Sequence, residues 1–203
     1  SKKILAWYDN SKRELPWRVG KKSPKKVYYR LLSEFMLQQT QVKTVIPYFN
    51  KFTKKFKTLK DLSKSNEKVI LKMWEGLGYY RRARNLLACS KYLVNYHNSK
   101  IPKTLEELKK LPGIGDYTGN ALLGLVYDKP TIAIDGNVKR VFSRFYAVQE
   151  PIEKSKIFIK NIAEKHLPDN RHGDYAQALM DLGSLICIPK SPRCKMCPLL
   201  AIC

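Results

Sequence analysis

The sequence has few acidic residues and no long hydrophobic run. Only 17 Asp and Glu residues stand against 39 Lys and Arg residues, which gives a net charge of +22 over 203 residues. This excess is far larger than solubility requires and predicts a polyanionic partner, with nucleic acid as the first candidate. Lysines spread over every solvated face could explain any single basic run, but they do not explain the total. No apolar run approaches the length needed to cross a bilayer.

Two other common features are missing. Nothing at the N-terminus reads as a signal peptide, because the opening lysines lead into an amphipathic stretch that contains Trp7, Tyr8 and Asp9. We therefore expect an intracellular, cytoplasmic protein, which in a bacterium would be associated with the nucleoid. The alternation of polar and apolar residues that marks β-strands is also missing, whereas apolar residues recur at helical spacing almost throughout. The expected fold is all-α.

Apolar spacing and capping residues predict individual helices. The pattern Thr-Leu-Glu-Glu that starts at Thr104 is typical of a capping box, and it opens a short helix that must end before Pro112. The other expected helices cover residues 27–38, 41–52 with a bend at Pro47, 66–74 behind a Ser65/Asn66 cap, 81–96, and a segment that starts just beyond Gly115.

The turn between the last two of these helices reads Leu-Pro-Gly-Ile-Gly at 111–115. Gly113 and Gly115 would let the backbone turn sharply and would admit a phosphate group too close for any Cβ. Ile114 would hold the turn to the core. A Gly-x-Gly turn alone is weak support for a phosphate site, because helix connections use glycine routinely. Further along, Asp135 stands at the start of another helix, where taken alone it is best interpreted as an N-cap.

The chain has five cysteines, and four of them lie near its end. An odd number in a chain long enough to form its own core argues against a disulfide framework. Thiolates can bind zinc or an iron–sulfur cluster. Structural zinc sites usually use two close pairs, whereas this run has one close pair with outer cysteines at unequal distances, so the spacing favours a [4Fe-4S] cluster and leaves zinc open. The four candidate ligands are Cys187, Cys194, Cys197 and Cys203, and Cys89 is expected to be a buried apolar residue.

Six segments follow one another along the chain: LPWR at 15–18, SEFMLQQTQV at 33–42, WEGLGYYRRARNL at 74–86, the turn at 111–115, DGNVKR at 135–140 and the cysteine run. In this order they resemble the motifs of the helix–hairpin–helix DNA glycosylases of the endonuclease III superfamily, and within it the MutY-type adenine DNA glycosylases. The resemblance implies two helical lobes with DNA between them, one at about 25–132 with the hairpin and one formed by about 1–24 and 133–203. It also implies the [4Fe-4S] cluster in place of zinc.

The resemblance assigns opposite tasks to two carboxylates. Adenine is a poor leaving group, so one acid must protonate it while another group stabilises the cationic sugar. By similarity, Glu34 protonates adenine N7 and Asp135 stabilises the oxocarbenium ion. Glu34 could instead be an exposed helix charge, but its apolar neighbours leave little exposed face, and apolar surroundings favour the protonated form that an acid needs.

Position 117 distinguishes the subclasses of this superfamily. Bifunctional relatives have a lysine there that forms a Schiff base with the sugar, whereas this chain has Tyr117, so the resemblance implies a monofunctional enzyme. Tyr117 and Asn137 resemble residues that bond to Asp135 and the sugar. The resemblance also implies that Trp17 and Arg18 line the adenine pocket and that Gln38, Gln39 and Tyr79 wedge into the base stack. Lys139 and Arg140 are expected to contact phosphates, as are Gly113 and Gly115, and a solvated helix face is the alternative for the two basic residues.

The resulting expectation is a monomeric glycosylase in base excision repair that removes adenine mispaired with 8-oxoguanine or guanine in double-stranded DNA. Family members normally continue past the last cysteine into a domain that recognises 8-oxoguanine. A thymine or uracil mismatch glycosylase of the same superfamily is the first alternative, since it can also carry tyrosine at position 117. The second alternative is a DNA-binding module with a cluster and no catalysis, which would be expected to lack Glu34 or Asp135.

Overall fold

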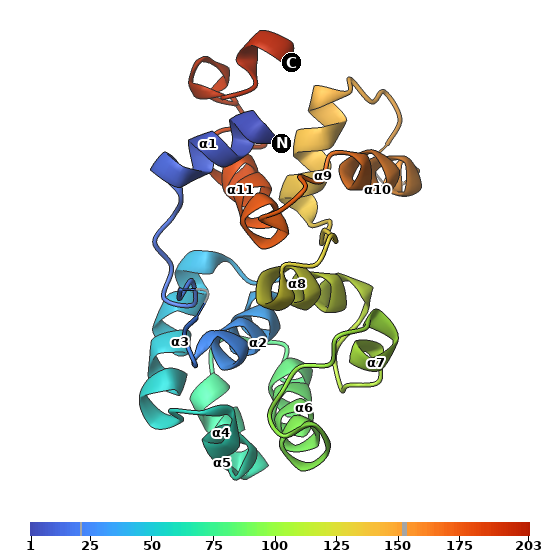
Figure 1. The fold of residues 1–203 in the computed structure, drawn as a ribbon. Coiled ribbons are helices and arrows are strands. Elements are labelled where there is room, and N and C mark those ends of the chain that lie inside the picture. The colour runs from blue at the N-terminus through green and yellow to red at the C-terminus, as the bar shows by residue number, and fades with distance from the viewer. Residues whose placement is uncertain (21, 152–153) are drawn as a thin grey trace. The chain divides into compact units, whose positions relative to one another are not determined.

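The computed structural model describes residues 1–20, 22–151 and 154–203, and over these ranges it contains helices and no strand (Figure 1). The all-α prediction is therefore confirmed. The chain divides into two compact units: unit 1 is Ser1–Arg13 with Leu123–Cys203, and unit 2 is Glu14–Leu122. Both boundaries lie earlier along the chain than residues 24 and 132, where the sequence placed them. Among the described residues, no helix has both the length and the apolar character to cross a membrane.

Unit 2 is built around a core of large apolar side chains. Helix α2 packs against α3 and α6, and α5 packs against both α3 and α6. Leu31, Phe35, Phe49 and Trp74 are fully buried among these helices, so burial of their apolar area stabilises the unit. The helices of unit 2 are α2 (Lys26–Leu37), α3 (Val42–Lys55), α4 (Leu59–Ser63), α5 (Glu67–Trp74), α6 (Arg81–His97), α7 (Leu105–Lys109) and the start of α8 (Asp116–Tyr127), which crosses the boundary at Leu122.

Side-chain caps fix several of these helix starts. Asn66 accepts a hydrogen bond from the Val69 N–H at 2.9 Å, and Thr104 accepts one from the Glu107 N–H at 3.3 Å, so both predicted N-caps are present. The Glu107 carboxylate accepts from the Thr104 hydroxyl at 2.9 Å, where a capping box would have it accept from the backbone N–H. Apolar spacing does not predict α4, which has only five residues. A capping box at Thr58 fixes its start instead, because the Thr58 hydroxyl and the Asp61 carboxylate each accept the other's backbone N–H.

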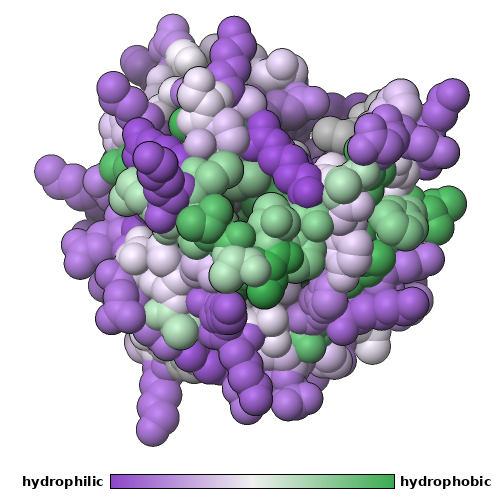
Figure 2. Space-filling model, turned by 90° about the horizontal axis from the view of Figure 1, so that it is seen from above, coloured by the Kyte–Doolittle hydropathy of each residue, from purple (hydrophilic) through white to green (hydrophobic). Residues whose placement is uncertain are grey.

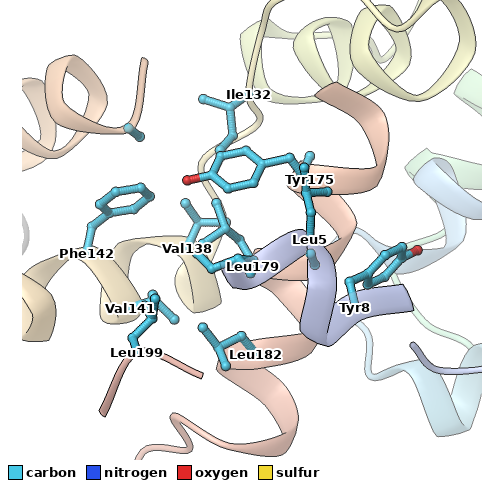
Figure 3. Close-up of a cluster of buried hydrophobic side chains, with 14 of the residues drawn as sticks. Leu5, Tyr8, Ile132, Val138, Val141, Phe142, Tyr175, Leu179, Leu182 and Leu199 are labelled. Atoms are coloured by element: carbon cyan, nitrogen blue, oxygen red, sulfur yellow. The ribbon is translucent and has the colours of Figure 1, made fainter. Parts of the chain in front are cut away.

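Unit 1 has a separate hydrophobic core, in which α1 and α9 both pack against α11 and α10 packs against α9. Figure 3 shows Leu5, Val138, Tyr175 and Leu179 turned toward one another from α1, α9 and α11. Side chains far apart in the sequence therefore share one core. The elements of unit 1 are α1 (Lys2–Ser11), α9 (Gly136–Phe145), α10 (Lys156–Lys165), α11 (His172–Leu185) and two short 3-10 turns, Cys194–Met196 and Leu200–Ile202.

A buried ion pair fixes the chain where it leaves α1. The Arg13 Nε atom lies 2.6 Å from the Asp181 Oδ1 atom, and the Arg13 backbone N–H donates to Oδ2 at 3.1 Å. The Asp181 side chain is completely buried on α11. Because an uncompensated buried charge is costly, this pair holds the end of α1 to α11.

Candidate active site

Glu34 lies on the buried face of α2, with only 8% of its surface exposed. Its neighbours Leu31, Leu32 and Phe35 are fully buried. The prediction that Glu34 is not an exposed helix charge therefore agrees with its burial in the structure. Its role as the acid stays a prediction.

Asp135 is the N-cap of α9, as the sequence predicts. Its Oδ1 atom accepts a hydrogen bond from the Val138 N–H at 2.7 Å, and its Oδ2 atom accepts one from the Asn137 Nδ2 at 2.9 Å. A carboxylate is an acceptor on both oxygens, and here each oxygen has its own donor. The two bonds fix the orientation of the carboxylate at the helix start, and Asn137 is placed beside it as the sequence predicts.

Arg140 holds Asn137 in place. Its Nη2 atom donates to Asn137 Oδ1 at 2.8 Å, and its Nε atom donates to the carbonyl of Cys187 at 2.7 Å. The sequence indicated Arg140 as a phosphate contact, but these bonds engage its guanidinium group inside unit 1. A series of hydrogen bonds thus connects Cys187 through Arg140 to Asn137 and Asp135. The sequence did not predict this series, because one of its acceptors is a backbone carbonyl, which no motif reveals.

Gly183 on α11 allows this arrangement. A Cβ atom at Gly183 would lie 2.6 Å from Asn137 Cβ and 3.0 Å from Asn137 Cα, so no side chain fits there. Arg140 Nη2 also donates to the Gly183 carbonyl. Lys139, predicted as a phosphate contact, is half-buried in the first turn of α9, and its role stays a prediction.

The turn between α7 and α8 uses its two glycines for different reasons. Gly113 has a φ angle of +77°, and a Cβ there would lie 2.7 Å from Asn85 Cβ and 2.8 Å from Phe35 Cε1. Gly115 is exposed and has no atom within 4 Å of a Cβ built on it. Ile114 is buried, as expected for the residue that holds the turn to the core. The protein's own packing thus requires Gly113 but leaves open space beside Gly115.

Tyr117 follows this turn on the first turn of α8, and 39% of its surface is exposed. The adjacent Thr118 hydroxyl accepts a hydrogen bond from Gln38 Nε2 at 3.2 Å. Unit 2 therefore brings the residue after α2 next to the start of α8. Gln38 and Tyr117, two predicted site residues far apart in the sequence, therefore lie near each other, because Gln38 is bonded to the residue that follows Tyr117.

Gln39 and Tyr79 share an unusual backbone conformation. Gln39 has a φ angle of +56° and Tyr79 one of +49°, in the left-handed region that residues with a Cβ rarely adopt. Both side chains are exposed, Tyr79 to 62%. Strained and exposed residues cluster at functional sites, which supports the prediction that these residues contact a ligand.

Trp17 and Arg18 lie in a turn in which the Arg18 N–H donates to the Leu15 carbonyl at 2.9 Å. The Trp17 ring is 3% exposed and meets the Phe49 ring edge to face, with 5.3 Å between the centroids. Trp17 is therefore part of the packing of unit 2, while Arg18 is half-buried. Their role in an adenine pocket stays a prediction.

The four candidate metal ligands lie beyond α11. Cys187 and Cys197 pack against the core of unit 1, whereas Cys194 and Cys203 are exposed. Burial raises the pKa of the Cys197 thiol, and the other three thiols add to the increase. The described residues include no group of three His, Cys, Asp or Glu side chains at metal-ligating distance.

The donor set suits an anionic cluster. It consists of thiols alone, and Arg144 Nη1 donates to Cys187 Sγ at 3.4 Å, which places a cation beside a prospective thiolate. Arg144 also donates to the carbonyls of Ile188 and Pro189 at 2.7 and 2.8 Å, which fixes the start of the segment. The fifth cysteine, Cys89, is fully buried as predicted, and burial raises its pKa to about 12.

The surface carries both hydrophilic and apolar side chains. Figure 2 shows long hydrophilic side chains around a group of hydrophobic residues on one face. In the cysteine segment, large apolar side chains of Met196, Leu200 and Ile202 are exposed.

The chain is similar to known DNA repair proteins. Over 201 residues it is 41% identical to an adenine DNA glycosylase of Buchnera aphidicola subsp. Baizongia pistaciae, an alignment that covers 98% of this chain and 56% of the relative. It is 38% identical over 207 residues to the adenine DNA glycosylase of Rattus norvegicus. That alignment covers 98% of this chain and 40% of the rat protein. The chain thus spans only about half the length of these relatives.

Solved structures and a family model agree with this similarity. The structure of a thermostable thymine-DNA glycosylase matches with a TM-score of 0.85 and 27% identity, covering 100% of this chain and 92% of that one. A non-covalent endonuclease III–DNA complex has the same fold, with a TM-score of 0.78 and 21% identity, and the match covers 100% of this chain and 91% of that one. The model of the HhH-GPD superfamily base excision DNA repair proteins matches residues 32–168. The chain therefore belongs to the HhH-GPD superfamily of base excision DNA repair proteins.

Proposed function

We propose that this chain holds the catalytic part of a monofunctional DNA glycosylase that hydrolyses the N-glycosidic bond of adenine mispaired with 8-oxoguanine or guanine. The relatives named adenine DNA glycosylase, which align over almost the whole chain, support adenine as the substrate base. Monomeric binding to mismatched double-stranded DNA and action in the cytoplasm or nucleoid are parts of the same proposal. The net charge of +22 supports binding to a polyanion.

One observation carries the proposal: the chain holds two carboxylates in opposite environments. Glu34 is buried among fully buried apolar residues of α2, whereas Asp135 is held by two N–H donors at the start of α9. Cleavage of a glycosidic bond requires a proton donor and a fixed negative charge. These two residues supply one of each.

The reaction then proceeds as follows. Glu34 donates its proton to adenine N7 while the bond from C1′ to N9 breaks and its electron pair leaves with the base. The carboxylate of Asp135 stabilises the positive charge on the sugar, and Asn137 holds that carboxylate in its orientation. A water molecule adds its oxygen to C1′, and its proton returns to Glu34. The products are free adenine and an abasic site.

Tyr117 limits the reaction to base removal. A Schiff base with the sugar requires a primary amine, and a phenol cannot form one. Tyr117 is exposed at the start of α8, where its phenol can contact the sugar without forming a lasting covalent bond. The strand is therefore not cut.

DNA binding and base extrusion are assigned to unit 2 and the first turn of α9. The open space beside Gly115 suits a phosphate close to the backbone, with Gly113 shaping the turn and Lys139 adding a positive charge. Gln38, Gln39 and Tyr79 enter the base stack and hold it open, and Trp17 and Arg18 line the pocket for the extruded adenine.

We further propose that Cys187, Cys194, Cys197 and Cys203 hold a [4Fe-4S] cluster. The all-sulfur donor set and the Arg144 guanidinium beside Cys187 support it. The cluster would supply structural cross-linking of the segment after α11. Protein purified without oxygen should contain about four irons per chain. Stoichiometric zinc in place of iron would contradict this part of the proposal.

A thymine mismatch glycosylase is the second candidate, since the thermostable thymine-DNA glycosylase structure matches the whole chain. Single-turnover excision on duplexes with adenine opposite 8-oxoguanine, adenine opposite guanine, and thymine or uracil opposite guanine separates the two. We expect excision from the two adenine duplexes alone. Excision of thymine or uracil with adenine left intact would contradict the proposal, and binding without any excision would indicate a non-catalytic module.

A further inference from the structure

Arg82, in the first turn of α6, is a buried cation whose hydrogen-bond acceptors are backbone carbonyls. Only 6% of its surface is exposed. Its Nη1 atom donates to the carbonyls of Phe35 and Met36 at 3.4 and 2.8 Å and, in a shorter bond, to that of Gln38. Its Nη2 atom donates to the carbonyls of Leu77 and Gly78 at 3.1 and 3.2 Å. One guanidinium thus joins the C-terminal end of α2 to the turn between α5 and α6.

Two aromatic rings complete the surroundings of Arg82. Its guanidinium carbon lies 5.5 Å from the Trp74 ring centroid and 5.3 Å from that of Tyr79. A cation over an aromatic face is attracted to it, more strongly when both are shielded from water. Tyr79, proposed to enter the base stack, therefore rests against Arg82 through its ring as well as through its backbone.

The bonded carbonyls occupy particular positions. The Gln38 carbonyl belongs to the peptide group that precedes Gln39, and the Gly78 carbonyl belongs to the one that precedes Tyr79. Gln39 and Tyr79 both have left-handed backbone conformations, with φ angles of +56° and +49°. Arg82 therefore fixes the peptide plane ahead of each strained residue, and such strain persists only where surrounding contacts enforce it.

We propose that Arg82 is a positioning residue that locks the Gln38–Gln39 turn to the Tyr79 turn, so that both enter the base stack as one rigid unit. The inference rests on the proposed function for the task of Gln39 and Tyr79. A residue that only capped α2 would need the carbonyls of Phe35 and Met36 alone. The bonds from Nη1 reach the end of α2, 46 and 44 residues away in sequence at Met36 and Gln38. The bonds from Nη2 reach a second segment, at Leu77 and Gly78, which lies just before α6.

Arginine is required for this task rather than positive charge alone. Its planar fork presents donors in two directions at fixed angles, whereas a lysine ammonium is a single point with three donors. Arg82→Lys should therefore keep the positive charge but lose the hydrogen bonds to one of the two segments.

The test compares Arg82→Met with Arg84→Met. Arg84 lies on the same helix, is 54% exposed, and pairs with Glu67 at 2.8 Å, so its substitution removes the same charge without touching either turn. Single-turnover excision is measured on a duplex with adenine opposite 8-oxoguanine and on the same sequence with adenine in an unpaired bubble. On the duplex, Arg82→Met should lower the rate about 100-fold, the scale expected when a positioned group shifts by about 1 Å.

On the bubble, where no base pair must be opened, Arg82→Met should lose less than about tenfold, because only the opening step needs the wedge. Arg84→Met should stay within about threefold of wild type on both substrates, as a rim charge does. Arg82→Lys should resemble Arg82→Met. Tyr79→Ala combined with Arg82→Met should lose little more than either single variant, since residues that act as a unit are not additive.

An equal loss on duplex and bubble would overturn the proposal, because it would indicate damage to the pocket or the fold. An unchanged rate on the duplex, or full activity of Arg82→Lys, would overturn it as well. Amide hydrogen exchange gives a readout that does not depend on activity. The amides of Thr40 and Leu77 donate to the carbonyls of Leu37 and Trp74 at 3.2 and 3.0 Å, and they should exchange faster together in Arg82→Met and remain protected in Arg84→Met. If wild type excises adenine from neither substrate, the proposed function fails, and the exchange result alone decides whether Arg82 joins the two turns.

Discussion

At the scale of single residues, the two carboxylates should be separable from DNA binding. Glu34→Gln and Asp135→Asn each remove a group that acts in the transition state and few phosphate contacts. Each should lower single-turnover excision by about 10³-fold or more, while affinity for the duplex stays within about tenfold. Near-wild-type turnover in either variant would refute the assignment of that residue.

Tyr117→Lys should change the outcome of the reaction. The substitution places a primary amine on an exposed position at the start of α8. The variant should form an adduct with the sugar that borohydride traps, and it should nick the strand. Wild type, assayed in parallel, should form little adduct. Efficient strand cleavage by wild type would be incompatible with a monofunctional enzyme.

The sequence predicted the local roles of single residues better than it predicted their tertiary contacts. Asp135 was expected at a helix start and is the N-cap of α9, since N-caps depend on local sequence. The engagement of Arg140 with Asn137 and Cys187 could not be foreseen, because it depends on α9 and α11 meeting in space. The contacts of Arg82 could not be foreseen for the same reason, because its acceptors lie on two segments that meet only in the fold.

At the scale of elements, local signals predicted several helices up to the start of α9, but they predicted no individual helix at α4, α10 or α11. Helix α5 was expected from residue 66 and runs from Glu67 to Trp74, because Asn66 caps it. Helix α4 has five residues, too few for apolar periodicity to stand out. The capping residues that fix these helix starts, Thr58 and Asn66, lie next to the helices in the sequence, so their pattern can be recognised even where apolar periodicity is absent.

The turn between α7 and α8 offers a matched pair of glycine substitutions. Gly113→Ala should destabilise the protein by about 2–4 kcal/mol, because a Cβ is disfavoured at a positive φ and would overlap Asn85 and Phe35. Gly115→Ala meets open space and should leave the free energy of unfolding within about 0.5 kcal/mol of wild type.

The same pair tests the phosphate site. If a phosphate approaches the backbone at Gly115, the added methyl group of Gly115→Ala should weaken duplex binding even though the fold is unchanged. Thermal unfolding and a binding titration on each variant separate the two effects. Unchanged affinity in Gly115→Ala would remove Gly115 from the proposed phosphate contacts.

At the scale of the whole molecule, the fold class was predictable because helical spacing runs through nearly the entire chain. The division of the chain into two units was harder to predict. Unit 1 combines α1 with elements beyond Leu123, and the boundaries depend on which side chains share a core, such as Leu5 with Tyr175 and Leu179 (Figure 3). Sequence neighbours do not reveal that sharing, and the boundaries expected at about residues 24 and 132 therefore differ from the limits of the two units, at Arg13 and Leu122.

The net charge of +22 leads to the last prediction, which concerns binding to DNA as a whole. Each phosphate that a lysine or arginine neutralises releases counterions, so affinity for a duplex should fall by about 10³-fold or more between 50 and 200 mM salt if six or more phosphates are contacted. Excision at saturating enzyme should change far less, because buried Glu34 and the bonded Asp135 are screened much less than surface lysines. Equilibrium binding and single-turnover rates across that salt range measure the two quantities. A shallow salt dependence of binding would mean that most of the basic residues are a solvated surface without contact to DNA, and recognition would then have to rest on the pocket and the residues that enter the base stack.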